Sequence, residues 1–223
     1  MKRTKLKERK LPNYTRGEEI ANMVTHIIGG VIGIVALVLC VIFATLNENI
    51  YGIVSASIFG VMMILLYTIS SIYHGLYPGT AKKVMQVLDH CTIYLLIAGT
   101  YTPIVLCSVR SYNVLIGWIL FGIIWLLAIL GIVLNAIDLK KYKIFSMICY
   151  LGMGWCIIFL APKFLEILDK GGTLLLILGG VSYTIGAILY SIGSKKKYFH
   201  TIFHVFVDIG SLLHFLCVLL YVI

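Results

Sequence analysis

The sequence predicts an all-α protein, a bundle of seven transmembrane helices. The chain of 223 residues is 61% hydrophobic and only 12% charged, and its mean hydropathy is +1.02. Water-soluble domains are closer to half apolar. Apolar stretches long enough to cross a hydrocarbon core of about 30 Å occur seven times. The chain is therefore an integral, multi-pass membrane protein, which we expect in the cell membrane.

The seven expected spans follow one another with little chain between them. The first follows a basic start, but its apolar run of about 25 residues exceeds the core of a cleaved signal peptide, so we expect it to remain as a helix. The third contains Pro103, which should kink it because proline lacks the backbone N–H. The spans are residues 20–46, 50–74, 84–109, 111–134, 144–162, 172–194 and 198–222.

Short connections make consecutive helices antiparallel neighbours in one bundle. The sequence thus divides into a basic tail, residues 1–19, and one membrane domain, residues 20–223. All six cysteines fall inside apolar spans without metal-binding spacing, which favours buried, unpaired thiols.

The net charge of +9 reflects sorting of the basic residues among the loops. The tail and the second, fourth and sixth loops carry 15 of the 18 lysines and arginines, whereas the first, third and fifth loops carry three. The positive-inside rule then places the N-terminus in the cytoplasm and the C-terminus outside. The excess of basic residues is therefore explained by membrane topology. We expect membrane lipids, not nucleic acid, as partners.

With this topology, four polar groups from three helices share one layer near the cytoplasmic side. His74 ends the second span, Asp89 lies near the start of the third, and His200 and His204 lie one turn apart at the start of the seventh. Ser70 precedes His74 by one turn on the same helix face. Ionisable residues inside a membrane span are costly, so this layer is a functional-site hypothesis.

The residue types indicate a zinc site. Two imidazoles at positions i and i+4 can chelate one ion, and His74 would complete a set of three with His200 and His204. Three histidines leave a fourth tetrahedral position for water, whose pKa zinc lowers towards about 7. Asp89 could then act as the base or orient the water, and Ser70 could donate a hydrogen bond near the metal.

Four further polar residues in the spans receive no fixed role. His26 suits helix packing or hydrogen bonding better than metal binding. His90 points about 100° away from Asp89, and we favour the carboxylate at the metal. His214 lies about 15 Å beyond His204, too far to share one ion. Asp208 fits three interpretations: a neutral acid, a partner of His204, or a participant in proton movement.

Several of these motifs resemble those of the progestin and adipoQ receptor superfamily. They are Ser70-Ser-Ile-Tyr-His74, Leu88-Asp89, His200-Thr-Ile-Phe-His204 and Leu213-His214-Phe215. Glu18-Glu-Ile-Ala-Asn22 with Thr25-His26 is similar to the haemolysin III-like bacterial branch. The resemblance implies zinc held by His74, His200 and His204, with Asp89 on the metal water, and lipid amide hydrolysis of the ceramidase kind. We expect no long soluble N-terminal domain of the kind that the larger receptors carry.

Our first functional hypothesis is a zinc-dependent hydrolase of a lipid amide or ester that affects the lipid state of the membrane. A membrane-lipid sensor or receptor with a structural zinc is the second, and a haemolysin or pore-forming protein is the third. The pore is disfavoured because only one face of the seventh span is polar. The sequence does not reveal the substrate or the oligomeric state.

Overall fold

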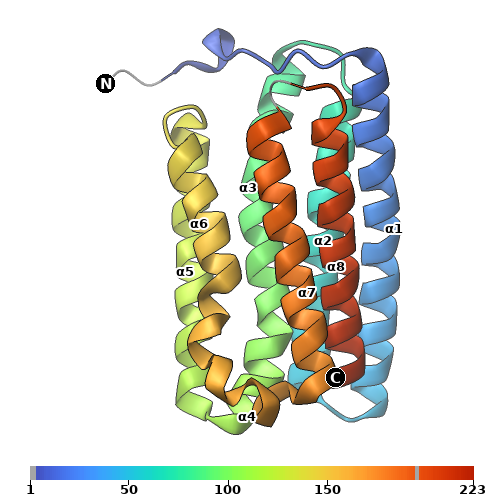
Figure 1. The fold of residues 1–223 in the computed structure, drawn as a ribbon, viewed down its shortest axis with the longest axis vertical. Coiled ribbons are helices and arrows are strands. Elements are labelled where there is room, and N and C mark those ends of the chain that lie inside the picture. Colours follow the sequence, from blue (N-terminus) through green and yellow to red (C-terminus); the bar gives the residue numbers. More distant parts are fainter. Residues whose placement is uncertain (1–3, 194–195) are drawn as a thin grey trace.

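The computed structural model describes residues 4–193 and 196–223, and the regular structure in these ranges is entirely helical (Figure 1). Lys2, Arg3 and Lys195, which contribute to the basic bias, lie outside the described residues. In chain order the elements are η1 (Leu6–Glu8), α1 (Arg16–Leu46), α2 (Ile50–Gly75), α3 (Thr80–Pro103), η2 (Ile104–Val109), α4 (Arg110–Tyr112), α5 (Val114–Asp138), α6 (Lys143–Trp155), η3 (Cys156–Lys163), α7 (Phe164–Gly193) and α8 (Phe199–Tyr221).

Six helical segments in the described part of the chain are long and apolar enough to cross a membrane. They correspond to six of the seven expected spans. The expected fifth span, residues 144–162, corresponds to a shorter apolar helix, Lys143–Phe159. Large aliphatic side chains such as Ile34, Ile123 and Leu126 are exposed on the outside of the bundle, as expected for a surface that faces lipid.

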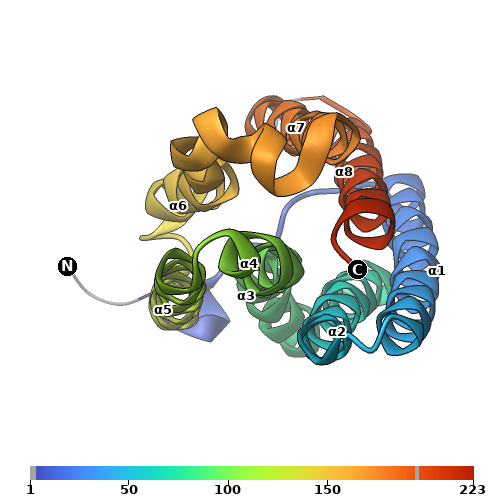
Figure 2. The same ribbon diagram turned by 90° about the horizontal axis from the view of Figure 1, so that it is seen from below.

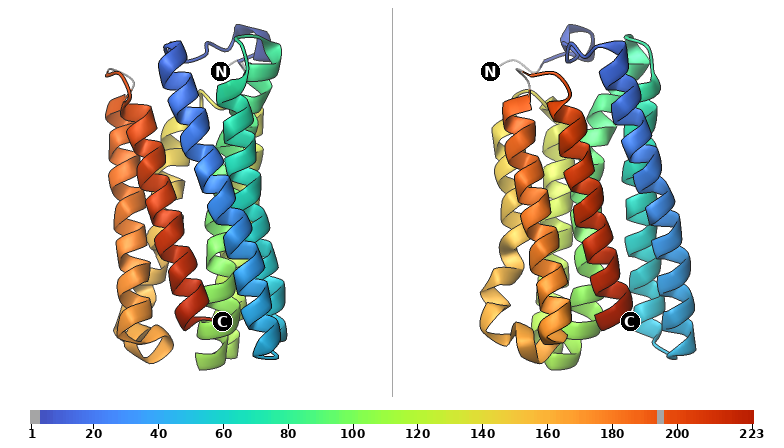
Figure 3. Two further views of the ribbon diagram at one scale, coloured as in Figure 1. Left: turned by 90° about the vertical axis from the view of Figure 1, so that its right-hand side faces the viewer. Right: turned by 45° about the vertical axis from the view of Figure 1, so that its right-hand side comes forward.

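The helices form a ring when the bundle is viewed along its long axis (Figure 2). Helix α1 packs between α2 and α8, α3 packs against α2 and α5, and α6 lies between α5 and α7. Helix α7 packs along α8 and so closes the ring. The beginning of α1 and the end of α8 lie at opposite ends of the bundle (Figures 1 and 3).

A capping box starts α1 earlier than the hydropathy predicts. The Thr15 side chain accepts a hydrogen bond from Glu18 N (3.3 Å), and the Glu18 carboxylate accepts one from Thr15 N (2.9 Å). These bonds satisfy backbone donors that the first helical turn leaves free. The helix therefore begins at Arg16, inside the segment expected to be tail, and Glu18 and Glu19 become part of its first turn.

The expected disturbance at Pro103 takes the form of a change in helix type. The α-helical hydrogen bonds end at this residue, and residues 104–109 continue as a π-helix. Proline cannot donate to the carbonyl four residues earlier, so a local change in the hydrogen-bond ladder is expected there.

Close helix contact depends on glycine at one position beside the candidate site. A Cβ atom on Gly29 of α1 would lie 2.5 Å from a ring carbon of Tyr67 and 2.6 Å from a carboxylate oxygen of Asp208. Only glycine lets α1 approach these two side chains so closely.

Candidate metal centre

Three histidines from two helices meet at the end of the bundle where α1 begins. His74 lies in the last turn of α2, and His200 and His204 lie in the first two turns of α8. One ring nitrogen from each residue lies within 4.8 Å of the other two. The Nε2 atoms of His200 and His204 are 3.1 Å apart. The structure thus brings together the three residues that the sequence predicts as metal ligands.

The imidazole of His74 is buried and held by α1. Its Nδ1 lies 2.7 Å from a Glu19 carboxylate oxygen and 3.4 Å from Asn22 Nδ2. A carboxylate accepts hydrogen bonds, so Glu19 favours the tautomer with the proton on Nδ1. The Nε2 atom of His74 has no hydrogen-bond partner among the described residues. Its lone pair is therefore available to a metal.

The imidazole of His204 is buried and is held by the same helix, one turn further along. Its Nδ1 lies 3.2 Å from the Asn22 carbonyl oxygen and 3.3 Å from Thr25 Oγ1. The carbonyl oxygen accepts a hydrogen bond from the Nδ1–H group, which leaves Nε2 without a proton and directed at His200.

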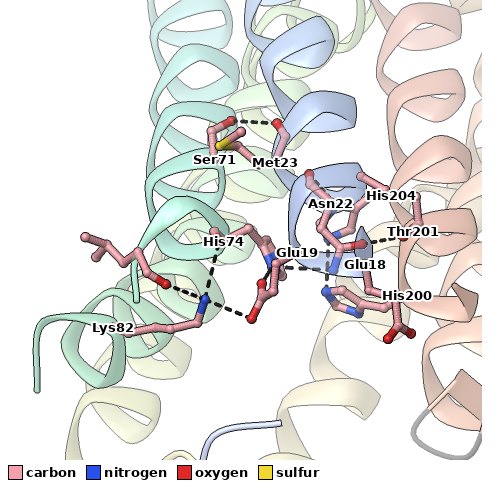
Figure 4. A network of polar contacts seen from close by, with 12 residues as sticks. Glu18, Glu19, Asn22, Met23, Ser71, His74, Lys82, His200, Thr201 and His204 are labelled. Atoms are coloured by element: carbon pink, nitrogen blue, oxygen red, sulfur yellow. Dashed lines mark hydrogen bonds and ion pairs between the residues drawn. The ribbon is translucent and has the colours of Figure 1, made fainter. Parts of the chain in front are cut away.

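Helix α1 also binds the elements that carry these ligands (Figure 4). Thr201 Oγ1 donates to Asn22 Oδ1 (2.6 Å), and Tyr198 N at the start of α8 donates to Glu18 Oε1 (2.9 Å). On the opposite side, the buried Lys82 of α3 pairs with Glu19 (2.8 Å) and donates to two carbonyl oxygens at the end of α2. None of these residues was predicted from the sequence as part of the site.

The arrangement fits a tetrahedral metal such as zinc. Zinc takes imidazole nitrogen at about 2.0–2.1 Å, which separates two nitrogen ligands by roughly 3.3 Å. The 3.1 Å separation of the His200 and His204 nitrogens is close to this value. The hydrogen bond from Nδ1 to the Asn22 carbonyl oxygen leaves a lone pair on Nε2 of His204, and one cation between the two rings would accept lone pairs from both Nε2 atoms. The unpartnered His74 Nε2 would supply the third ligand.

A cavity of about 190 Å³ runs along the bundle from this cluster. His200, His204 and His214 all lie on its wall. His200 and His214 are about 21 Å apart along α8 at 1.5 Å per residue, so the cavity extends well beyond the cluster. Ser70 and Asp89 also line it. The rest of the wall is mostly apolar, and it combines aliphatic side chains such as Leu66, Ile93, Leu96, Ile97, Leu151 and Val207 with aromatic ones such as Tyr101, Tyr150, Trp155 and Phe203.

The two predicted catalytic residues, Ser70 and Asp89, line this cavity, but they are not among the candidate metal ligands that the structure groups together. Among the described residues, the candidate ligand atoms that lie within 4.8 Å of one another come from the three histidines and do not include Asp89. Ser70 is fully buried, and its Oγ has no hydrogen-bond partner among the described residues. Their catalytic roles stay predictions.

The four polar residues without an assigned role lie in different surroundings. The buried ring of His26 stacks on His204 with centroids 3.5 Å apart. His90 lines the cavity beside Tyr190. Asp208 lies beside Gly29, near Tyr67. His214 directs Nε2 to a backbone carbonyl on α7 (3.1 Å), and it does not belong to the histidine cluster.

Tyr14, an aromatic residue of the N-terminal segment, also lies at the site and was not predicted there from the sequence. The Tyr14 ring lies nearly parallel to the His200 ring, with centroids 5.1 Å apart, and it lines the cavity. Burial, together with nearby Tyr190, Glu19 and Asp89, raises the pKa of the Tyr14 hydroxyl well above its usual range. Tyr14 is therefore neutral at physiological pH.

Fold and site together define a helical, multi-pass membrane protein with a three-histidine candidate metal centre at one end of its bundle. The chain belongs to the haemolysin-III related family, whose model matches residues 14–215. This finding confirms the resemblance to the haemolysin III-like branch of the progestin and adipoQ receptor superfamily.

Known proteins from bacteria and mammals match most of the chain. Hemolysin-3 of Bacillus cereus is 41% identical over 206 residues, which cover 92% of each protein. The Hemolysin-3 homolog of Bacillus subtilis (strain 168) is 41% identical over 208 residues, 93% of this chain and 96% of the relative. The human Monocyte to macrophage differentiation factor is 24% identical over 207 residues, 89% of this chain and 82% of the relative.

Proposed function

We propose that the protein is a zinc-dependent membrane hydrolase that cleaves an amide or ester bond of a lipid. One observation carries the proposal: three histidine side chains converge beside a largely apolar cavity inside the bundle, with one ring nitrogen of each within 4.8 Å of the other two. The nitrogen ligands suit zinc, and the apolar part of the wall suits the chain of a lipid.

The residues of the cavity have the chemistry that hydrolysis needs. A zinc ion held by His74, His200 and His204 would supply a Lewis acid and would lower the pKa of water. Asp89 would accept the proton of the attacking water, because its carboxylate lines the same cavity. Ser70 would donate a hydrogen bond to the substrate carbonyl oxygen, since its hydroxyl has no other partner among the described residues.

The proposal includes a membrane orientation. Seven crossings, with α6 and η3 as the fifth, and an N-terminus in the cytoplasm would set the histidine cluster in the cytoplasmic half of the bilayer. The sorting of 15 of the 18 basic residues into the tail and alternate loops supports this orientation. We expect the cell membrane as the location.

The relatives' names suggest one alternative, because two of them are called Hemolysin-3 or its homolog. A water-filled pore needs a continuous polar lining, whereas much of the cavity wall consists of aliphatic and aromatic side chains. A lipid sensor with structural zinc would use the same ligands without turnover, and the experiment below separates it from the hydrolase.

The test uses purified full-length protein in lipid nanodiscs and three variants. Wild type should bind about one zinc per chain and release fatty acid from a ceramide analogue or another lipid amide or ester. Asp89→Asn should retain zinc and lose hydrolysis, because the three imidazoles are unchanged and the proton acceptor is gone. His204→Ala should lose both zinc and hydrolysis, and Glu166→Gln, an exposed surface change, should lose neither.

Two results would overturn parts of the proposal. Zinc bound by wild type with no hydrolysis across a broad panel of lipid amides and esters would favour the sensor. Zinc retained in full by a His200→Ala, His204→Ala double variant would remove the metal assignment itself.

A further inference from the structure

The N-terminal segment crosses the end of the bundle that holds the histidines. Residues 4–15 run over the ring of helices from the α5 side to the start of α1 (Figures 1 and 2). Thr4 N donates to the Asp138 carboxylate at the end of α5 (2.7 Å), and the Lys83 ammonium group of α3 donates to the Lys7 carbonyl oxygen (2.7 Å). The segment is thus attached at two points before Thr15 caps α1.

Its last residues reach the metal layer. Pro12 and Tyr14 both line the cavity. The Tyr14 ring stacks on His200 with an interplanar angle of 21°, and its centroid lies 6.1 Å from that of His74. Tyr14 therefore contacts two of the three candidate ligands and forms part of the cavity wall.

His200 needs such support more than the other two ligands do. Glu19 holds His74, and the Asn22 carbonyl oxygen holds His204. Within residues 4–193 and 196–223, the one polar atom at hydrogen-bond distance from the His200 ring is Nε2 of His204, which is itself a candidate ligand. A stacked aromatic ring restricts the rotation of an imidazole that has no anchoring hydrogen bond of its own.

We propose that Tyr14 is a positioning residue for His200 and that residues 4–15 close the metal centre at the N-terminal end of the bundle. The inference rests on the proposed metal site and goes beyond it. It assigns to the tail a direct part in the centre: metal and water-soluble molecules reach the histidines from this end only when the segment is displaced.

The experiment measures how fast a chelator removes the metal. Full-length protein in nanodiscs is loaded with Co²⁺, whose visible absorption reports the histidine ligands, and excess EDTA is then added. Tyr14→Ala should lose cobalt roughly two- to tenfold faster than wild type, the range expected for one aromatic pair. Tyr14→Phe keeps the ring and should match wild type. The matched control is Tyr77→Ala, because Tyr77 is 86% exposed and lies in the next connection at the same end.

A second variant tests closure independently of the ring. Deletion of residues 2–8 removes the contacts of Thr4 and Lys7 but keeps Tyr14 and the Thr15 cap, and it should also speed cobalt loss. Extraction at the wild-type rate from both Tyr14→Ala and the deletion variant would overturn this inference while leaving the metal site intact. A wild type that binds no cobalt or zinc would instead overturn the proposed function.

Discussion

Replacement of Glu19 tests whether α1 sets the affinity of the candidate metal centre. Glu19→Gln is nearly isosteric but removes the negative charge beside His74 Nδ1, which lies 2.7 Å away. The carboxylate makes that imidazole a stronger ligand and fixes its ring, and a neutral amide does both less well. Loss of such an outer partner typically weakens metal binding 10–100-fold, or about 1.4–2.7 kcal/mol.

The substitution also affects Lys82, so a second variant must separate the two effects. Lys82 is buried and would lose its 2.8 Å ion pair, although its two carbonyl acceptors remain. Lys82→Met removes the cation and keeps the contact between Glu19 and His74. We expect it to alter metal affinity less than Glu19→Gln does.

The assay is competition for zinc between the purified protein and a chromophoric chelator in nanodiscs. His74→Ala gives the loss expected for a missing ligand, and Glu166→Gln is the control at an exposed ion pair with Lys163. Thermal unfolding of the metal-free variants checks that the bundle is intact. If Glu19→Gln binds zinc within twofold of wild type while His74→Ala does not bind it, the argument that Glu19 tunes His74 is wrong.

Two further predictions concern packing and topology. Gly29→Ala should lower the thermal unfolding temperature, because its Cβ would lie within 2.6 Å of Tyr67 and Asp208 and such overpacking typically costs about 1–3 kcal/mol. Gly122→Ala is the control, since no atom outside its own helical turn lies within 4 Å of that position, and equal unfolding temperatures for the two variants would contradict the packing argument. A membrane-impermeant maleimide should label Lys196→Cys only from the cytoplasmic side and Glu48→Cys only from outside. The reverse labelling pattern would invert the proposed orientation.

Much of the fold follows from the sequence because lipid imposes a simple rule on helix length and polarity. Apolar runs predict the helices, and the distribution of basic residues predicts their orientation. Together they predict that His74 lies in the same layer as His200 and His204. The structure brings these three together. Asp89 shares their cavity without joining their cluster, because a depth along the bundle axis does not fix the distance between two helices.

The residues that hold the ligands in place could not be predicted from apolar runs and basic residues. Glu19 and Asn22 occupy the first two turns of α1, where acidic and amide residues are ordinary helix-start residues. Their contacts with His74 and Thr201 depend on how α1 packs between α2 and α8, a tertiary property. The position of Tyr14 could not be predicted for another reason, because a basic, polar tail predicts a solvated segment.

One sequence feature nevertheless connects these residues. The capping box at Thr15 and Glu18 fixes where α1 begins, and Glu19, Asn22 and His26 then recur at intervals of three and four residues. That interval places them on one face of a helix. A polar face at the end of an otherwise apolar span needs polar partners from neighbouring helices, and in this fold the partners belong to α2, α3 and α8. The residue that precedes the capping box, Tyr14, stacks on His200, so the start of α1 supplies both the residues that hold the ligands and the ring that we propose to position His200.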